Sequence, residues 1–108
     1  MPQITYGLTG VPGTTTKIAS TDTASTLATL GVTIEDHAIG ALITCETNGI
    51  RFAFNATPDD DAGTALGHVL AADESLYLSN PEQINDLKVV SKTAASAAVL
   101  QVTLYKRY

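Results

Sequence analysis

Residues 38–55 read AIGALITCETNGIRFAFN, and this stretch decides the fold that the sequence predicts. The first half, up to Glu46, is almost continuously apolar, as in a strand that is covered on both faces. The second half alternates large apolar residues with polar or small ones, as a half-buried strand does. Asn48-Gly49 lies between the two halves, and this pair favours a hairpin because a type I′ turn needs positive φ at both central positions. The sequence therefore predicts an antiparallel hairpin over residues 38–55.

Further strand signals lie on both sides of this hairpin. The last of them is the most regular, because Ala98, Leu100, Val102 and Leu104 share one face in strict period-2 alternation. The predicted strands outside the hairpin cover residues 30–34, 74–79, 86–92 and 97–107, while residues 66–72 fit either a short helix or a strand.

Only one helical segment is predicted with a clear start. Pro81 to Asn85 forms a single helical turn, with Asn80 as its cap and Pro81 at the first position. Six or seven short strands with at most one short helix indicate an all-β fold. We expect a single antiparallel β-sandwich or jelly-roll-like domain.

The N-terminal residues differ from the rest of the chain. Only Lys17 and Asp22 are charged there, and Gly10, Pro12 and Gly13 stand too close together for a helix. We expect residues 1–24 to form an extended arm, and residues 25–108 to form the sandwich domain. Such an arm becomes ordered by adding to a neighbour's sheet or by docking on another surface.

Composition excludes several classes of protein. A chain of 108 residues has room for one core, and 44% hydrophobic with 16% charged residues is not a disordered composition. The net charge of −5 argues against nucleic-acid binding, and the single cysteine excludes an intramolecular disulfide. Residues 1–8 lack the pattern of a signal peptide, and the most apolar stretch, residues 38–45, is far short of the roughly 20 residues that cross a bilayer. We therefore expect neither export by a signal peptide nor a membrane partner.

The residues that could carry chemistry are few. His37 and His68 lie 31 positions apart without a local metal motif, and we expect the first in a turn and the second at a strand edge. Cys45 lies in an apolar strand, which indicates a buried structural thiol rather than a nucleophile. No catalytic motif is present, so the sequence predicts no enzyme and no cofactor.

An acidic run is the one dense group of oxygen ligands. Asp59, Asp61 and Gly63 give a fragment of a calcium loop, but no glutamate follows until Glu74. A solvated loop tip is the favoured interpretation, and cation binding stays open as an alternative.

Two segments could form an interface. The C-terminus carries a basic and aromatic cluster that suits either a contact surface or an ordinary strand end. The candidate interface residues in the arm and this cluster are Ile4, Tyr6, Leu8, Val11, Pro12, Tyr105, Arg107 and Tyr108.

The second half of the chain also carries a run of short motifs. They are IRFAF at 50–54, ATP at 56–58, GHVL at 67–70, LYL at 76–78, PEQI at 81–84, LKVV at 87–90 and AVLQVTLY at 98–105. With these motifs, residues 49–108 resemble small structural proteins of tailed bacteriophages and prophages. The resemblance implies a β-sandwich or jelly-roll subunit of a virion.

Within that group we expect a capsid decoration (cement) protein that stabilises the head from outside. The resemblance implies the major capsid protein as partner, self-association as a homotrimer, synthesis in the host cytoplasm and a final place on the head exterior. The arm over residues 1–16 would bridge neighbours. The first alternative is a tail or fibre module that binds host carbohydrate. The second is a cupin-like metal enzyme, which requires His37, His68 and an acid to converge.

Overall fold

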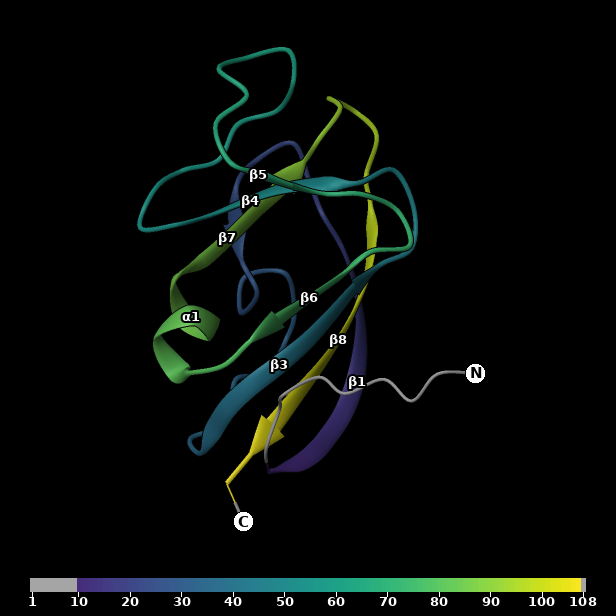
Figure 1. The fold of residues 1–108 in the computed structure, drawn as a ribbon. Coiled ribbons are helices and arrows are strands. Elements are labelled where there is room, and N and C mark those ends of the chain that lie inside the picture. Colours follow the sequence, from purple (N-terminus) through teal and green to yellow (C-terminus); the bar gives the residue numbers. More distant parts are fainter. Residues whose placement is uncertain (1–9, 108) are drawn as a thin grey trace.

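The computed structural model describes residues 10–107, which form two four-stranded antiparallel sheets packed as a sandwich (Figure 1). Sheet A has the order β1 (Val11–Ala19), β8 (Val99–Lys106), β3 (Ala38–Cys45) and β6 (Ser75–Leu78). Sheet B has the order β2 (Ser25–Thr26), β7 (Leu87–Ser91), β4 (Ile50–Phe54) and β5 (His68–Leu70). The predicted all-β sandwich is confirmed.

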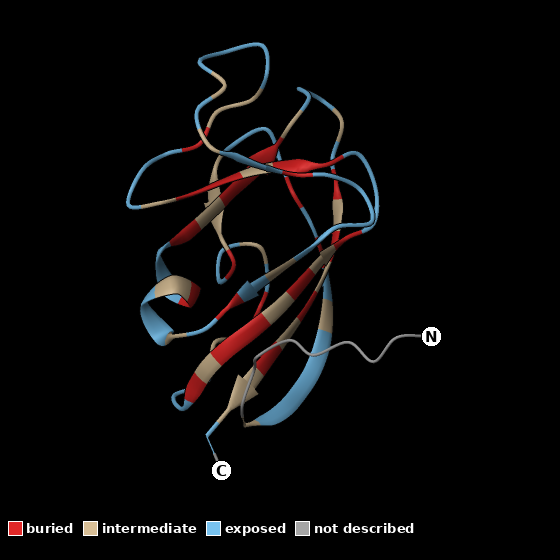
Figure 2. Cartoon of the chain, in the orientation of Figure 1, coloured by how far each residue is buried: buried red, intermediate tan, exposed pale blue. Residues whose placement is uncertain are grey.

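The core lies between the two sheets and follows the alternation of the strands. Figure 2 shows buried and half-buried residues alternating along β3 and β8. Leu100 and Val102 point inward from β8 and meet Cys45 and Ile43 of β3, their register partners. The face predicted for residues 98–104 is therefore the buried face.

The one helix in residues 10–107, α1 (Pro81–Asp86), forms as predicted. Asn80 is the N-cap, with extended backbone at φ −155°, and its Oδ1 accepts a hydrogen bond of 2.9 Å from the Gln83 N–H. Pro81 occupies the start of the helix, where its missing N–H costs nothing. Ile84 is buried beneath the helix, so this single turn closes one end of the sandwich.

The predicted hairpin is wrong in its pairing. Asn48 and Gly49 have φ of 65° and 75°, as their sequence demands, yet β3 lies in sheet A and β4 in sheet B. Both edges of β3 are already occupied, by β8 and by β6, so β4 has no edge to join. The Asn48 side chain instead donates to Ala97 O at 2.9 Å and fixes the turn as a corner between sheets.

The division at residue 24 also differs in the structure. Residues 11–19 of the expected arm form β1, which pairs antiparallel with β8 of the same chain. Ile18 of this strand is buried in the core, so the segment belongs to the sandwich. Residues 1–9 of the expected arm lie outside the described residues.

The strand predicted over residues 30–34 is wrong. Residues 27–31 form turns in which Leu30 N–H and Val32 N–H both bond back to Leu27 O. Gly31 has φ of 115°, which takes the chain out of the extended conformation. The ambiguous stretch over residues 66–72 contains a strand, β5, rather than a helix.

Truncations should separate the part of the N-terminal region that holds the sandwich from the part that does not. Removing residues 1–16 takes away most of β1, and each lost ladder hydrogen bond is worth about 1 kcal/mol. We expect the free energy of unfolding in urea to be lower by about 2 kcal/mol or more than that of a chain that lacks only residues 2–9. Equal stability of the two truncated chains would contradict the assignment of β1 to the sandwich.

A buried hydroxyl pair gives a second test of the fold. Ser20 Oγ lies 2.9 Å from Ser91 Oγ and accepts from the Ala98 N–H at 2.8 Å, and both serines are buried. Ser20→Ala leaves two buried polar groups without a partner, so we expect a loss of about 2 kcal/mol. Ser91→Ala keeps the bond from Ala98 and should cost less. Urea denaturation of both variants checks this order.

Candidate functional site

The outer side of sheet A is a regular surface of strand side chains that the described residues leave partly or fully exposed. Alternation that buries one set of side chains turns the next set outward. We call this set the outer face; its members are Thr15 and Lys17 of β1, Gln101, Thr103 and Tyr105 of β8, Leu42 and Thr44 of β3, and Ser75 and Tyr77 of β6.

The outer side of sheet B is different, because the loop over residues 55–67 lies against it. Arg51 points outward from β4, and its guanidinium donates to Gly67 O at 3.1 Å and pairs with Asp61 at 2.7 Å. Val90 shares the outward row with Arg51 and is nevertheless only 2% exposed. Sheet A is therefore the sheet with an open face.

Register pairing arranges the outer face in rows. One row runs Thr15, Thr103, Leu42, Tyr77, and the next runs Lys17, Gln101, Thr44, Ser75. Hydroxyl groups pair along these rows, with 2.6 Å between the Oγ1 atoms of Thr15 and Thr103 and 3.2 Å between Thr44 Oγ1 and Ser75 Oγ. Because these hydroxyls already have partners, the face can be covered at a small desolvation cost.

Charge is almost absent from the outer face. Lys17 is the one charged member of the set, although the chain carries a net charge of −5. Glu46 lies just beyond the end of β3, where it accepts from Gln101 Nε2 at 3.2 Å. The set itself contains no Asp or Glu, which lowers the repulsion between the outer face and another acidic protein.

The structure brings some predicted interface residues together. Pro12 is the register partner of Tyr105, and Val11, which is 43% exposed, is the partner of Lys106. Pro12 and Tyr105 therefore continue the outer face toward one end of β8, whereas Val11 lies in the row of Lys106, which belongs to the opposite face. Arg107 does not join them, because it turns into a neighbouring cleft. The other predicted residues, Ile4, Tyr6, Leu8 and Tyr108, lie outside the described part of the chain.

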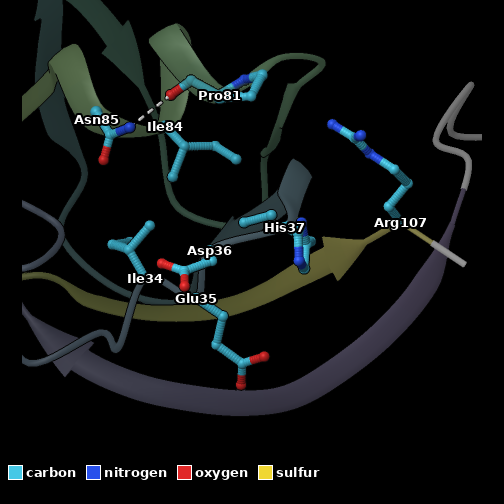
Figure 3. A pocket seen from close by; sticks show the side chains of 9 residues that line it. Ile34, Glu35, Asp36, His37, Pro81, Ile84, Asn85 and Arg107 are labelled. Atoms are coloured by element: carbon cyan, nitrogen blue, oxygen red, sulfur yellow. Dashed lines mark hydrogen bonds between the residues drawn. The ribbon is translucent and has the colours of Figure 1, made fainter.

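This cleft has a volume of about 310 Å³ and lies between residues 34–38, α1 and Arg107 (Figure 3). Ile84 contributes to an apolar wall, while Asp36, His37 and Arg107 contribute polar side chains. The Arg107 backbone N–H donates to His37 O at 3.0 Å, which ties the C-terminal end of β8 to this turn. The size and mixed polarity suit a small polar group.

The two histidines lie at separate sites. His37 is exposed at the cleft, whereas His68 lies on β5 with its ring 5.4 Å from that of Phe52. Within residues 10–107, no three His, Cys, Asp or Glu side chains are grouped so that they could hold a metal ion. The described residues thus lack the convergence that the cupin-like alternative requires.

Cys45 is a buried thiol, as the sequence predicts. It is 0% exposed, and burial is the main cause that raises the pKa of its thiol. Its Sγ lies 3.5 Å from Thr47 O. A thiol in this environment stays protonated and is a poor nucleophile.

The three carboxylates of Asp59, Asp60 and Asp61 stabilise the loop over residues 55–67 through hydrogen bonds and ion pairs. Asp59 Oδ2 accepts from the Thr64 N–H at 2.9 Å, and Asp60 Oδ1 accepts from the Gly63 N–H at 3.0 Å. Asp61 joins Arg51 and Lys92, each at 2.7 Å. The carboxylates thus already have partners within the chain.

These bonds set the pKa of two carboxyl groups. The backbone N–H groups of Thr64 and Asp60 lower the pKa of Asp59, and the side chains of Lys92 and Arg51 lower that of Asp61. A carboxyl with a lowered folded-state pKa contributes stability above its unfolded pKa, and this contribution disappears as the pH falls through the folded-state value.

Comparisons with known proteins give no relative: no family model, no curated protein and no solved structure matches the chain. No helix in the described part of the chain is long and apolar enough to cross a membrane.

Most of the outer face was not predicted from the sequence. The odd-numbered positions of residues 99–105 signalled one strip of it, but the neighbouring strips depend on strand order.

The acidic loop allows a test by pH. Because the pKa of Asp61 is lowered from its ordinary value of 3.8, its contribution to stability should be complete above about pH 5 and should decrease as the pH falls below that value. Asp61→Asn should therefore reduce the thermal midpoint at pH 7 and match the native chain more closely at pH 2.5. Asp36→Asn, at the cleft, is the control. An equal difference between native and D61N chains at both pH values would contradict the role of the charge.

Proposed function

We propose that this chain is a non-enzymatic structural subunit of a bacteriophage particle, of the decoration (cement) type, that binds the outside of the head. The observation that carries the proposal is the outer face of sheet A, a four-stranded surface with Lys17 as its one charged member. The resemblance of residues 49–108 to small phage structural proteins supports the viral assignment. The sandwich fold agrees with it but is shared by many other proteins.

Binding would stabilise the shell through contact alone. The outer face, with its paired hydroxyls, offers van der Waals area and a few polar contacts, so one subunit binds weakly. When many subunits bind at symmetry-related positions of the shell, the total binding free energy is large. The acidic remainder of the surface faces solvent, away from the packaged nucleic acid. The major capsid protein is the proposed partner, and the trimer that the resemblance implies stays a prediction.

A tail or fibre module that binds host carbohydrate is the second candidate. One observation favours it: Tyr77 and Tyr105 both lie on the outer face, with Gln101 and Thr103 on the strand of Tyr105. Aromatic rings beside amide and hydroxyl groups suit sugar binding. A glycan array probed with the full chain would show binding in this case and none for a decoration protein.

The decoration proposal is tested by placing a charge at the centre of the outer face. Thr103→Glu adds an unpaired carboxylate there, whereas Thr57→Glu adds the same group to an exposed loop. We expect co-sedimentation with phage heads, purified from the bacterium that carries the gene, to fall at least tenfold for T103E and to stay native for T57E. Circular dichroism establishes that both variants are folded.

Two results would overturn this reading. Native binding by T103E would remove the outer face as the contact surface. Failure of the native chain to bind heads, together with binding on the glycan array, would favour the tail or fibre module.

A further inference from the structure

The edge strands of the two sheets differ in length. β2, β5 and β6 have two, three and four residues, whereas β1 has nine. Short edge strands are a common means of preventing sheets from pairing with other chains. In residues 10–107, β8 is the only strand that pairs with β1, so one long edge is left open.

The hydrogen bonds of β8 show which groups of β1 face this open edge. Ser20 N–H donates to Ala98 O at 2.9 Å, and Val99 O accepts from Glu46 N–H at 2.8 Å on the side of β3. Because antiparallel bonding alternates, the even-numbered residues of β1 bond to β8. The N–H and C=O groups of Thr15 and Lys17 therefore point away from the sheet.

Protective features cover only the beginning of β1. Pro12 has no N–H group, and the register shifts between Pro12 and Thr15. From Thr15 onward the strand is regular and rich in β-branched residues. Lys17, whose side chain lies on the outer face in the row of Gln101, is the one charged residue of β1.

We propose that the open edge of β1 pairs with β1 of a second copy of this chain, antiparallel and about a two-fold axis perpendicular to the sheet. In this arrangement Thr16 lies opposite its own copy, and Thr15 of each copy exchanges backbone hydrogen bonds with Lys17 of the other. This proposal rests on the self-association part of the proposed function, but it specifies a dimer in place of the trimer that the resemblance implies.

Charge and backbone geometry select this register. A two-fold axis at Lys17 would place two like charges directly opposite each other, which is destabilising. An axis at Thr15 would extend the pairing through the whole irregular segment to Pro12 and Val11. With the axis at Thr16, the pairing reaches only Gly13 at that end, its central pairs over residues 15–17 lie in the regular part of β1, and each Lys17 lies opposite Thr15 of the other copy.

A groove next to β1 also favours a second copy as the occupant. Thr16 and Gly13 line it together with Val32 and Leu104, and its volume is about 350 Å³. Val32 and Leu104 are core residues at its wall. A second β1 brings another Thr16 to this opening and covers it, while joining two outer faces into one continuous surface.

Cysteine cross-linking tests the register directly. Non-hydrogen-bonded partners in antiparallel strands have Cα atoms about 4.5 Å apart, within the range of a disulfide. Thr16→Cys should therefore give mostly covalent dimer under mild oxidation. Thr14→Cys, which lies opposite Ile18 instead, should give less than a tenth as much. Cys45 is buried and does not compete. Equal cross-linking of both variants, or none, would overturn the proposal.

Sedimentation tests the edge itself. We expect the native chain to sediment at twice its 11.2 kDa mass, and Lys17→Ala, which keeps the backbone N–H, to do the same. Lys17→Pro removes an N–H that faces the open edge and spares the bonds to β8, so it should be a monomer. A native trimer, or a dimer that K17P leaves intact, would contradict edge pairing.

The two proposals fail in different ways. A native monomer that still binds phage heads would remove the edge pair and leave the decoration role. A dimer with the predicted cross-link that binds no heads would keep the edge pair and remove that role.

Discussion

Hydrogen bonds to the connection over residues 92–98 hold two of the places where the chain changes sheet, after β1 and after β3. Within residues 10–107, six of the seven connections between consecutive strands run from one sheet to the other, and β4 to β5 is the exception. The Asn48 side chain reaches Ala97 O, and Ser20 Oγ accepts from the Ala98 N–H. A chain with so few local hairpins depends on these corners, because each strand must find partners that are distant in sequence.

Core and surface of sheet A follow from one pattern. Leu100 and Val102 are buried because β8 alternates, and the same alternation turns Gln101 and Thr103 outward. A slip of one residue in β8 would exchange the two sets. Any partner that binds the outer face therefore depends on the native register of β8, because that register decides which side chains point outward.

The sequence predicts local conformation, such as a helix start or a turn, but it does not predict which strands pair with each other. Asn80 and Pro81 specify the start of α1 by themselves, so that prediction is confirmed. Asn48-Gly49 specifies two positive φ values and nothing about the strand that follows, which is why the turn was right and the hairpin was wrong. The same limit hid the outer face, since the neighbours of Thr103 come from β1 and β3.

The two sheets differ in how far their outer sides and edges are covered. Sheet B ends in strands of two and three residues, and the loop that contains Asp61 lies against its outer side. Sheet A keeps both an open face and a long edge at β1. If selection acted only on the stability of a monomer, covering that edge would be expected. A solvent-facing side is common in antiparallel sheets, so the long edge at β1 is the less usual feature. Because the outer face and this edge meet along β1, the two proposed contacts, a partner on the face and a second copy at the edge, are compatible with each other.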